Sequence, residues 1–169
     1  MRQRMTRSGL LILTTGGTID KNYFDALSEY QIVESGIPAL LREARVALPH
    51  RVEEICRKDS LDLTDADRAE IARRAGEAPE TRIVITHGTD TMTETAKVLA
   101  QAVPGKTIVL TGALSPARFA ETDAPFNLGM AFATAQTAPA GVWIVMSGEV
   151  FDGLKVRKDR AAGRFVAID

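Results

Sequence analysis

The sequence contains little of what would mark a membrane, secreted or nucleic-acid-binding protein. Among its 169 residues Cys56 is the only cysteine, so no disulfide can form within the chain. No apolar run approaches the ~20 residues that a membrane-spanning helix needs, and the run after the basic segment 1–7 is too short for a signal peptide. The net charge of −1 offers no field that would attract nucleic acid or an anionic membrane. We therefore expect a cytoplasmic protein with no nucleic-acid and no membrane partner.

Signatures of metal and nucleotide binding are also missing. Two histidines far apart in the sequence and one cysteine argue against a structural metal. The glycine-rich segments 14–18 and 86–91 fit neither the dinucleotide pattern G-x-G-x-x-G nor the phosphate-loop pattern G-x-x-x-x-G-K-[ST]. Cys56 falls near the end of a predicted strand, where a small buried apolar residue is a simpler interpretation than a reactive thiol. The candidates for chemistry are then hydroxyl, carboxylate and amine side chains.

Two stretches join a short apolar strand to a turn rich in threonine and glycine. The first is 10–18, which ends in Thr14-Thr15-Gly16-Gly17-Thr18, and the second is 82–91, which ends in Thr86-His87-Gly88-Thr89-Asp90-Thr91. Four apolar residues in a row at 10–13 suit a strand buried on both faces. Glycine lets the backbone turn sharply and approach a bound molecule, and open α/β sheets bind ligands just past the carboxyl ends of their strands. The two turns therefore predict a single composite site.

Strands and helices alternate along the chain at short intervals. Strands are predicted at 10–13, 52–56, 82–86, 107–111 and 142–146, and helices at 37–44, 64–75, 91–103 and 126–137. This order predicts one α/β domain over residues 1–169. Its mostly parallel sheet is flanked by helices in a three-layer Rossmann or flavodoxin-like arrangement, with a β-hairpin near the C-terminus.

Local signals refine this outline. Thr64 is a helix-cap residue, and Thr91-Met92-Thr93-Glu94 has the pattern of a capping box. Asp152-Gly153 is a hairpin-turn signal between two apolar pairs. The segment 20–31 shows no clear period and is predicted to be a loop with aromatic anchors, which could close over a ligand. For Phe24 the simpler interpretation is that its ring fills space under this loop.

The strand ends place Thr15, Ser60, Thr89 and Asp90 on one edge of the predicted sheet. Threonine is a usable nucleophile only when another group takes its proton. Lys158 and a hydroxyl relay through Thr89 are the candidate helpers. Burial would lower the pKa of the lysine, whereas a neighbouring Asp90 would raise it. Backbone N–H groups of the glycine-rich turns are candidates for an oxyanion hole.

Together, Thr15-Gly16-Gly17-Thr18-Ile19 and His87-Gly88-Thr89-Asp90-Thr91-Met92 resemble the two signature motifs of the bacterial-type asparaginase/glutaminase family. A weaker resemblance continues through 59–60, 111–113, 125–128 and 152–158. It covers nearly the whole chain but only the amino-terminal half of a usual family member, whose carboxy-terminal domain is absent. The resemblance implies a short-chain L-asparaginase that releases ammonia and L-aspartate through a threonyl ester, with no metal or organic cofactor. It also implies a homo-oligomer, a dimer or tetramer, acting on a small amino-acid amide.

The resemblance assigns roles to the matching residues of the catalytic group. Thr15 matches the primary nucleophile, and Tyr23 matches a mobile-loop tyrosine that orients it. Thr89, Asp90 and Lys158 match the group held next to the substrate amide, with Asp90 also taking the α-ammonium group. Three of these residues also have a purely structural interpretation. Thr15 suits a turn, Asp90 could support the start of the next helix, and Lys158 lies in a charge run typical of a solvated hairpin face. Which threonine attacks first stays open.

Substrate binding is assigned to residues beside the two motifs. Ser60 matches a residue that binds the α-carboxylate, and Asp59 and Gly88 are assigned to substrate binding with it. Ser60 could equally be an ordinary turn residue. Leu61 stands where a polar residue often helps to bind the carboxylate, so the choice between asparagine and glutamine stays open. His87 is interpreted as a structural histidine outside the mechanism.

Two other functions compete with the amidohydrolase. One is a catalytically inactive domain that binds an amino acid or regulates a partner. The presence of all four residues Thr15, Thr89, Asp90 and Lys158 argues against it, because an inactive site would not need them. The other is the amide-hydrolysing part of a tRNA-dependent amidotransferase, which also resembles this family. The near-zero net charge and the lack of an extra RNA-facing segment weigh against the second.

Overall fold

The computed structural model describes residues 9–169, and the basic segment 1–7 lies outside them. Six strands form the main sheet in the order β4-β1-β5-β6-β7-β8. They are β1 (Leu10–Gly16), β4 (His50–Lys58), β5 (Arg82–Thr86), β6 (Thr107–Thr111), β7 (Gly141–Met146) and β8 (Glu149–Asp152). The first five run parallel, and β8 is antiparallel to β7. The predicted α/β fold with a mostly parallel sheet is confirmed, and the bounds predicted for β5 and β6 agree with the structure.

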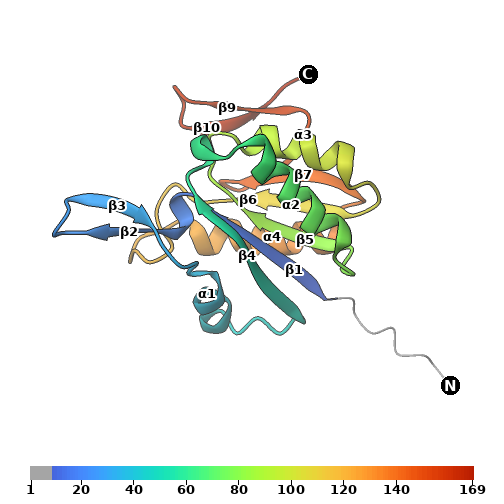
Figure 1. Cartoon of the computed structure of the whole chain (residues 1–169). Helices are drawn as coiled ribbons and strands as arrows, with labels where there is room; N and C mark the ends of the chain where they lie inside the picture. The colour runs from blue at the N-terminus through green and yellow to red at the C-terminus, as the bar shows by residue number, and fades with distance from the viewer. Residues whose placement is uncertain (1–8) are drawn as a thin grey trace.

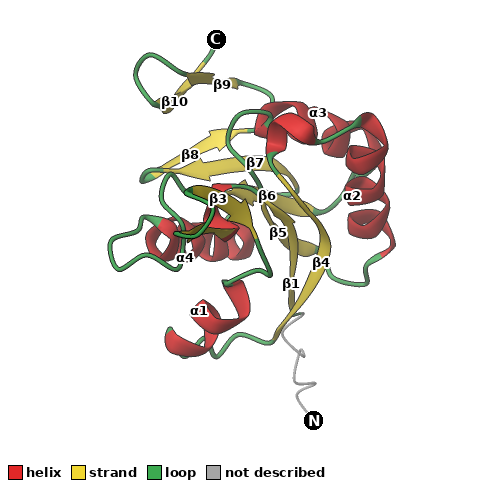
Figure 2. Cartoon of the chain, turned by 60° about the vertical axis from the view of Figure 1, so that its left-hand side comes forward, coloured by secondary structure: helices red, strands yellow, loops and turns green. Residues whose placement is uncertain are grey.

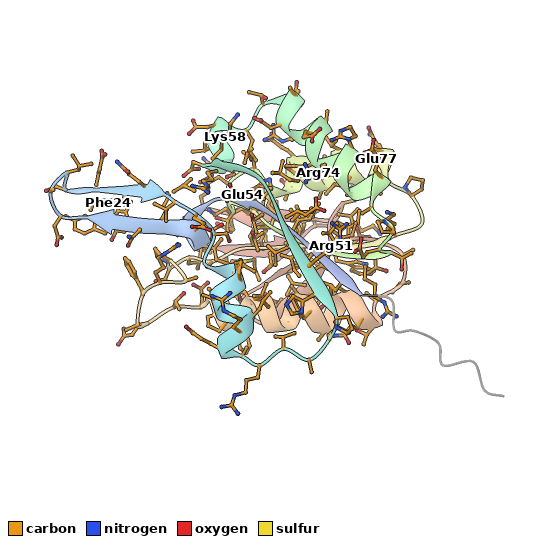
Figure 3. The ribbon with its side chains drawn as sticks, turned by 60° about the horizontal axis from the view of Figure 1, so that its bottom comes forward. Phe24, Arg51, Glu54, Lys58, Arg74 and Glu77 are labelled. Atoms are coloured by element: carbon orange, nitrogen blue, oxygen red, sulfur yellow. The ribbon has the colours of Figure 1, made fainter. Side chains whose placement is uncertain are left out.

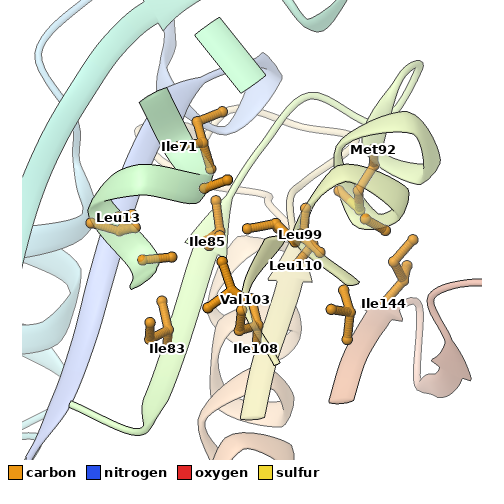
Figure 4. Close-up of a cluster of buried hydrophobic side chains, with 14 of the residues drawn as sticks. Leu13, Ile71, Ile83, Ile85, Met92, Leu99, Val103, Ile108, Leu110 and Ile144 are labelled. Atoms are coloured by element: carbon orange, nitrogen blue, oxygen red, sulfur yellow. The ribbon is translucent and has the colours of Figure 1, made fainter. Parts of the chain in front are cut away.

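Helices cover both faces of this sheet (Figures 1 and 2). They are α1 (Ile37–Glu43), α2 (Asp65–Glu77), α3 (Met92–Ala102) and α4 (Ala124–Thr137). Side chains alternate along a strand, so Leu11 and Leu13 of β1 pack with α2 and α3, whereas Leu10 and Ile12 pack with α1 and α4. Figure 4 shows the first of these clusters between the sheet and the two helices. Within residues 9–169 no helix is long and apolar enough to cross a membrane.

The segment predicted to be a loop at 20–31 is a β-hairpin. It consists of β2 (Lys21–Phe24) and β3 (Glu29–Ile32), which pair antiparallel. Tyr23 lies opposite Tyr30, and their ring centroids are 5.1 Å apart. The loop prediction is therefore wrong, because cross-strand aromatic pairing stabilises a hairpin that has no alternating apolar pattern. Figure 1 shows this hairpin projecting away from the main sheet.

The hairpin near the C-terminus exists, but not at the turn that the sequence indicated. β8 returns along β7 through Ser147-Gly148, where both residues have positive φ (52° and 85°). The terminal hairpin is β9 (Val156–Asp159) with β10 (Arg164–Ala167). Asp152-Gly153 does not join paired strands. A Cβ on Gly153 would lie 2.8 Å from the Val142 carbonyl oxygen, so this glycine is required by a close backbone approach.

Of the two predicted helix caps, one forms. The Thr64 hydroxyl accepts the amide of Asp67 at 3.2 Å, and the Asp67 carboxylate accepts the amide of Thr64 at 2.8 Å, so α2 begins with a capping box. The capping box predicted at Thr91 is wrong. The Thr91 hydroxyl instead donates to the Ser60 carbonyl oxygen at 2.7 Å, so it ties two turns together.

The edge strand β4 carries a row of paired charges. The Arg51 guanidinium donates to both carboxylate oxygens of Glu80, and Arg74 of α2 donates to Glu53. Figure 3 shows Arg51, Glu54 and Lys58 spaced along this strand. Charged side chains of this kind protect an edge from pairing with another strand.

Candidate active site

Lys158 joins the turn after β5 to the terminal hairpin. Its ammonium group donates to the Thr89 hydroxyl and to one carboxylate oxygen of Asp90, both at 2.7 Å. The Lys158 side chain is only 19% exposed, so this contact is sheltered from solvent. Arg160 lies at the outer side of the same carboxylate, with Nε 4.0 Å from Asp90 Oδ1. The structure thus brings together three residues that the sequence placed in one catalytic group.

The core anchors the hairpin that carries Lys158. Lys158 lies directly opposite Phe165 in the β9–β10 pair, and Val156 lies on the same face. Val156 and Phe165 are almost fully buried (5% and 4% exposed), and the Phe165 ring is 6.5 Å from that of Phe151 on β8. The face that buries two apolar side chains therefore also presents the lysine to Thr89.

The two glycine-rich turns touch through their backbones. A Cβ on Gly17 would lie 2.5 Å from the amide nitrogen of Gly88, and a Cβ on Gly88 would lie 2.7 Å from the Ser60 side chain. Gly17 also has a positive φ of 83°. Only glycine fits such contacts, so the ends of β1, β4 and β5 converge as the composite-site hypothesis expected. Thr18 and Thr89 each follow a glycine of this contact.

The two threonines of the first motif lie in different surroundings. Thr15 is still part of β1, is 1% exposed, and donates its hydroxyl hydrogen to the Thr86 carbonyl oxygen at 2.9 Å. Its own carbonyl accepts the Cys56 thiol, whose pKa is raised by burial. Thr18 comes after both glycines, is half-buried and lines a pocket. The hydroxyl predicted to attack is therefore occupied inside the sheet, whereas Thr18 borders open space.

Asp59 and Ser60 form a tight turn against the second motif. The buried Ser60 hydroxyl accepts the amide of Thr91 at 3.3 Å, which leaves its hydrogen free to donate elsewhere. Asp59 accepts the Lys21 ammonium at 3.0 Å and the amide of Leu61 at 3.3 Å. Burial disfavours the charged form of Asp59, but these hydrogen bonds outweigh it and lower the pKa of the carboxyl group. Leu61 itself is 63% exposed.

Tyr23 lies on the projecting hairpin. Its side chain is exposed and packs against Tyr30. In the described part of the chain, no hydrogen bond links it to Thr15, Thr89 or Lys158. The structure therefore does not bring this predicted site residue to the others.

His87 supports the second turn from inside the core, as its interpretation as a structural histidine predicted. Its Nδ1 is 2.6 Å from the Gly88 carbonyl oxygen and so carries the hydrogen, while Nε2 accepts the Thr95 hydroxyl at 2.7 Å. Burial lowers the pKa of the imidazole to about 4. His87 is therefore neutral and fixed in one tautomer near neutral pH.

Sequence reasoning did not assign the loop after β6 to the site. A pocket of about 360 Å³ is lined by Thr18, Lys21, Tyr30, Leu114, Ser115, Pro116 and Phe119. Asp123, just before α4, accepts the amides of Leu114 and Ser115, both at 2.9 Å. An aspartate at a helix start after a proline-containing loop is a signal that could have indicated this wall of the site.

Known proteins resemble this chain over most of its length. The family model described as "Asparaginase, N-terminal" matches residues 9–166. L-asparaginase 2 of Escherichia coli (strain K12) is 35% identical over 163 residues, which cover 88% of this chain and 46% of that protein. A glutamyl-tRNA(Gln) amidotransferase subunit of Pyrobaculum aerophilum is 36% identical over 174 residues, which cover 90% of this chain and 40% of that protein.

The fold agrees with these sequence matches. The thermostable L-asparaginase from Thermococcus kodakarensis superposes with a TM-score of 0.83 at 29% identity, over 95% of this chain and 51% of that one. The chain thus spans about half the length of the relatives it matches. The family model covers nearly all described residues, and both glycine-rich motifs meet in space. The chain therefore belongs to the asparaginase family and corresponds to its amino-terminal domain.

Proposed function

We propose that this chain hydrolyses the side-chain amide of L-asparagine to give ammonia and L-aspartate. The observation that carries the proposal is the hydrogen-bonded group of Lys158, Thr89 and Asp90 beside the contact between Gly17 and Gly88. A sheltered lysine on a threonine hydroxyl provides a route for protons. The glycine turns provide backbone N–H groups near the place where a carbonyl oxygen would gain charge.

For the nucleophile we propose Thr15, as the resemblance implies, and the geometry adds Thr18 as an alternative. Freeing the Thr15 hydroxyl would break its hydrogen bond to the Thr86 carbonyl in the interior, which costs about 1–3 kcal/mol. Thr18 carries no such cost, because no residue in the described chain accepts its hydroxyl. Thr18 also stands next to Gly17, which touches the residue before Thr89.

The proposed reaction proceeds in two steps. Lys158 first gives one proton to solvent. The threonine oxygen then attacks the amide carbon while its proton passes through Thr89 to the Lys158 amine, and Asp90 stabilises the lysine cation that results. The C–N bond then breaks as the leaving nitrogen takes that proton back from Lys158. Water afterwards cleaves the threonyl ester and regenerates the hydroxyl.

Substrate binding in this proposal uses the turns around the catalytic group. Asp90 holds the α-ammonium group, and Ser60 donates its free hydroxyl hydrogen to the α-carboxylate. Asp59 and Gly88 shape the same wall. Tyr23 contributes only if the β2–β3 hairpin moves toward the turns.

The proposal also covers the oligomeric state of the protein and its location in the cell. We infer one catalytic unit over residues 1–169, in a cytoplasmic homo-oligomer, either dimer or tetramer. Exposed apolar side chains around the site support association, because Tyr30, Leu61 and Leu114 are all more than half exposed.

Ammonia release from L-asparagine and L-glutamine tests the function. We expect release by the wild-type chain, loss in Thr15→Val, which keeps the shape of the buried side chain, and retention in Thr18→Ala. Thr137→Ala, on the exposed end of α4, serves as the control. Loss in Thr18→Ala alone would assign the attack to Thr18. Folded wild-type protein that releases ammonia from neither amide would exclude the amidohydrolase and leave an amino-acid-binding domain.

A second candidate is the amide-hydrolysing part of a tRNA-dependent amidotransferase. The relative from Pyrobaculum aerophilum, which is named as part of an amidotransferase, favours it. Glutamine would then be hydrolysed only in the presence of a second protein. Copurification of the chain with RNA or with such a protein tests this candidate.

A further inference from the structure

Arg68 is a buried arginine of α2 that has no part in the proposed function so far. Its side chain is only 6% exposed, whereas those of Arg73 and Arg74 on the same helix are 50% and 33% exposed. We propose that Arg68 is a positioning residue for substrate binding, which holds the Ser60 turn against the second motif. This inference rests on the proposed amidohydrolase function and adds to it the group that keeps the carboxylate-binding hydroxyl in place.

One end of the Arg68 guanidinium binds the chain that follows Ser60. Its Nη1 donates to the Leu63 carbonyl oxygen at 3.0 Å, and the Leu63 amide donates to the Ser60 carbonyl oxygen at 3.4 Å. Leu63 is itself buried. The turn that presents the Ser60 hydroxyl is therefore fixed at its far end by this arginine.

The other end of the guanidinium binds the helix that follows the second motif. Nη2 of Arg68 lies 3.2 Å from Oε2 of Glu94, which is in the first turn of α3. The Glu94 amide donates to the Thr91 carbonyl oxygen at 3.1 Å. Thr91 in turn donates its hydroxyl hydrogen to the Ser60 carbonyl oxygen and its amide to the Ser60 hydroxyl oxygen. These contacts form a closed ring that begins and ends at Ser60.

The ring fixes the direction of the Ser60 hydroxyl. Because the Ser60 oxygen accepts the Thr91 amide, its hydrogen is left to point toward a bound carboxylate. A binding group must be held within about 0.5 Å of its productive position to be effective. The affinity for the carboxylate end of the substrate therefore depends on how firmly the ring holds this turn.

Fold stability alone does not explain a charge at this position. The Arg68 guanidinium is removed from water, and its partner Glu94 is 60% exposed. Asp65 Oδ1 lies 4.0 Å from Nη1 but is fully exposed, and no acceptor for the Arg68 Nε lies among residues 9–169. An apolar side chain of similar volume is often as stabilising as a buried ion pair, or more so. The bonds from one guanidinium to two separate segments therefore favour a role in the site.

Replacement of Arg68 by methionine tests the inference. We expect Arg68→Met to stay folded, since methionine fills the space without a buried charge. KM for L-asparagine should rise about tenfold while kcat changes by less than about threefold, because the contacts of Lys158, Thr89 and Asp90 remain. Arg68→Lys should also raise KM, because one ammonium group does not span both partners. Arg73→Met, which removes an exposed guanidinium from the same helix, should change neither constant.

Amide hydrogen exchange tests the ring independently of activity. The Thr91 amide should exchange about tenfold faster in Arg68→Met than in the wild-type chain or in Arg73→Met. Glu94→Gln keeps the shape of the partner but removes its charge, so it should accelerate the same amide about threefold and raise KM in proportion.

The outcomes separate this inference from the proposed function. A folded Arg68→Met with the KM of the wild-type chain would overturn the positioning role and keep the amidohydrolase. A fall in kcat as large as the rise in KM would also overturn it, because Arg68 would then support the whole site. If the wild-type chain hydrolyses no amide, the function fails, and an unchanged exchange rate of the Thr91 amide in Arg68→Met would overturn the inference as well. If Arg68→Met does not fold, wild-type KM and exchange in Glu94→Gln would overturn it.

Discussion

The two small hairpins of this protein each carry one residue that the sequence placed in the site, yet only one of them reaches it. β9–β10 buries Val156 and Phe165 against the core, and its Lys158 meets Thr89 and Asp90. β2–β3 exposes both of its tyrosines, and Tyr23 packs only on Tyr30 within the described structure.

The difference shows what positions a side chain at the candidate site. An isolated two-stranded hairpin is marginally stable in water, so it becomes a rigid support only when one of its faces joins a core. β9–β10 meets that condition, and the ion pair between Lys158 and Asp90 adds to it. β2–β3 has no fully buried side chain and is suited to move with bound substrate.

The largest effect should appear in catalysis. Lys158→Met is expected to lower kcat for asparagine about a thousandfold, since the proton route from the nucleophile is removed. Tyr23→Phe should cost much less, because within residues 9–169 its hydroxyl makes no hydrogen bond to the catalytic group. Steady-state ammonia release measures both. If the two variants lose activity equally, the hairpins contribute equally to the site and the contrast between them is wrong.

A large effect on stability should follow when the buried side chain that anchors the β9–β10 hairpin is removed. Phe165→Ala is expected to lower the free energy of unfolding by about 3 kcal/mol, because a buried ring leaves a cavity and the hairpin loses its hold. Urea denaturation measures the change. Activity should also fall, since Lys158 lies opposite Phe165. Normal stability in this variant would show that the hairpin is held by the lysine contacts alone.

The sequence predicted the main sheet well because its strands are apolar runs buried on both faces, as at 82–86 and 107–111. It could not show where β1 ends. Thr15 and Thr18 have the same chemistry and both flank the glycines, and only the extension of β1 to Gly16 separates a buried hydroxyl from an accessible one.

Contacts between distant segments explain the errors at the predicted Thr91 cap and the predicted Asp152-Gly153 turn. Thr91 has the pattern of a capping residue, but the Ser60 carbonyl, distant in sequence, takes its hydroxyl. Gly153 follows an aspartate as in a hairpin turn, but its function is to let the backbone approach Val142. Lys158 could be found because its partners lie in a recognisable motif, whereas the anchoring by Phe165 has no local signature.

A smaller effect should come from pH through His87, which supports the turn that Lys158 contacts. The pKa of His87 is about 4 in the folded chain, below its ordinary value of 6.5, because the ring is buried. Between these values the unfolded chain binds a proton that the folded chain does not, so stability is highest above pH 6.5 and falls toward pH 4. Between about pH 7 and pH 5.5 the loss should be about 1 kcal/mol.

Urea midpoints at several pH values test this dependence. His87→Asn should lower stability throughout and remove this part of the slope, whereas His50→Gln, which alters the exposed histidine, should keep the wild-type slope. An unchanged slope in His87→Asn would mean that other groups cause the acid sensitivity.

The smallest effect should come from a substitution at the tip of the exposed β2–β3 hairpin. Leu27 at its tip is 58% exposed, and Leu27→Ser should change the free energy of unfolding by less than about 0.5 kcal/mol, since no buried contact is lost. Hydrogen exchange should agree, with fast exchange of the β2–β3 amides and protection of those in β9–β10. A Leu27→Ser variant that loses more than about 1 kcal/mol would show that the hairpin tip is covered in solution, as an interface between copies of the chain would require. The contrast between the hairpins would then hold only for the isolated chain, and Tyr23 would have the support that its predicted role in catalysis needs.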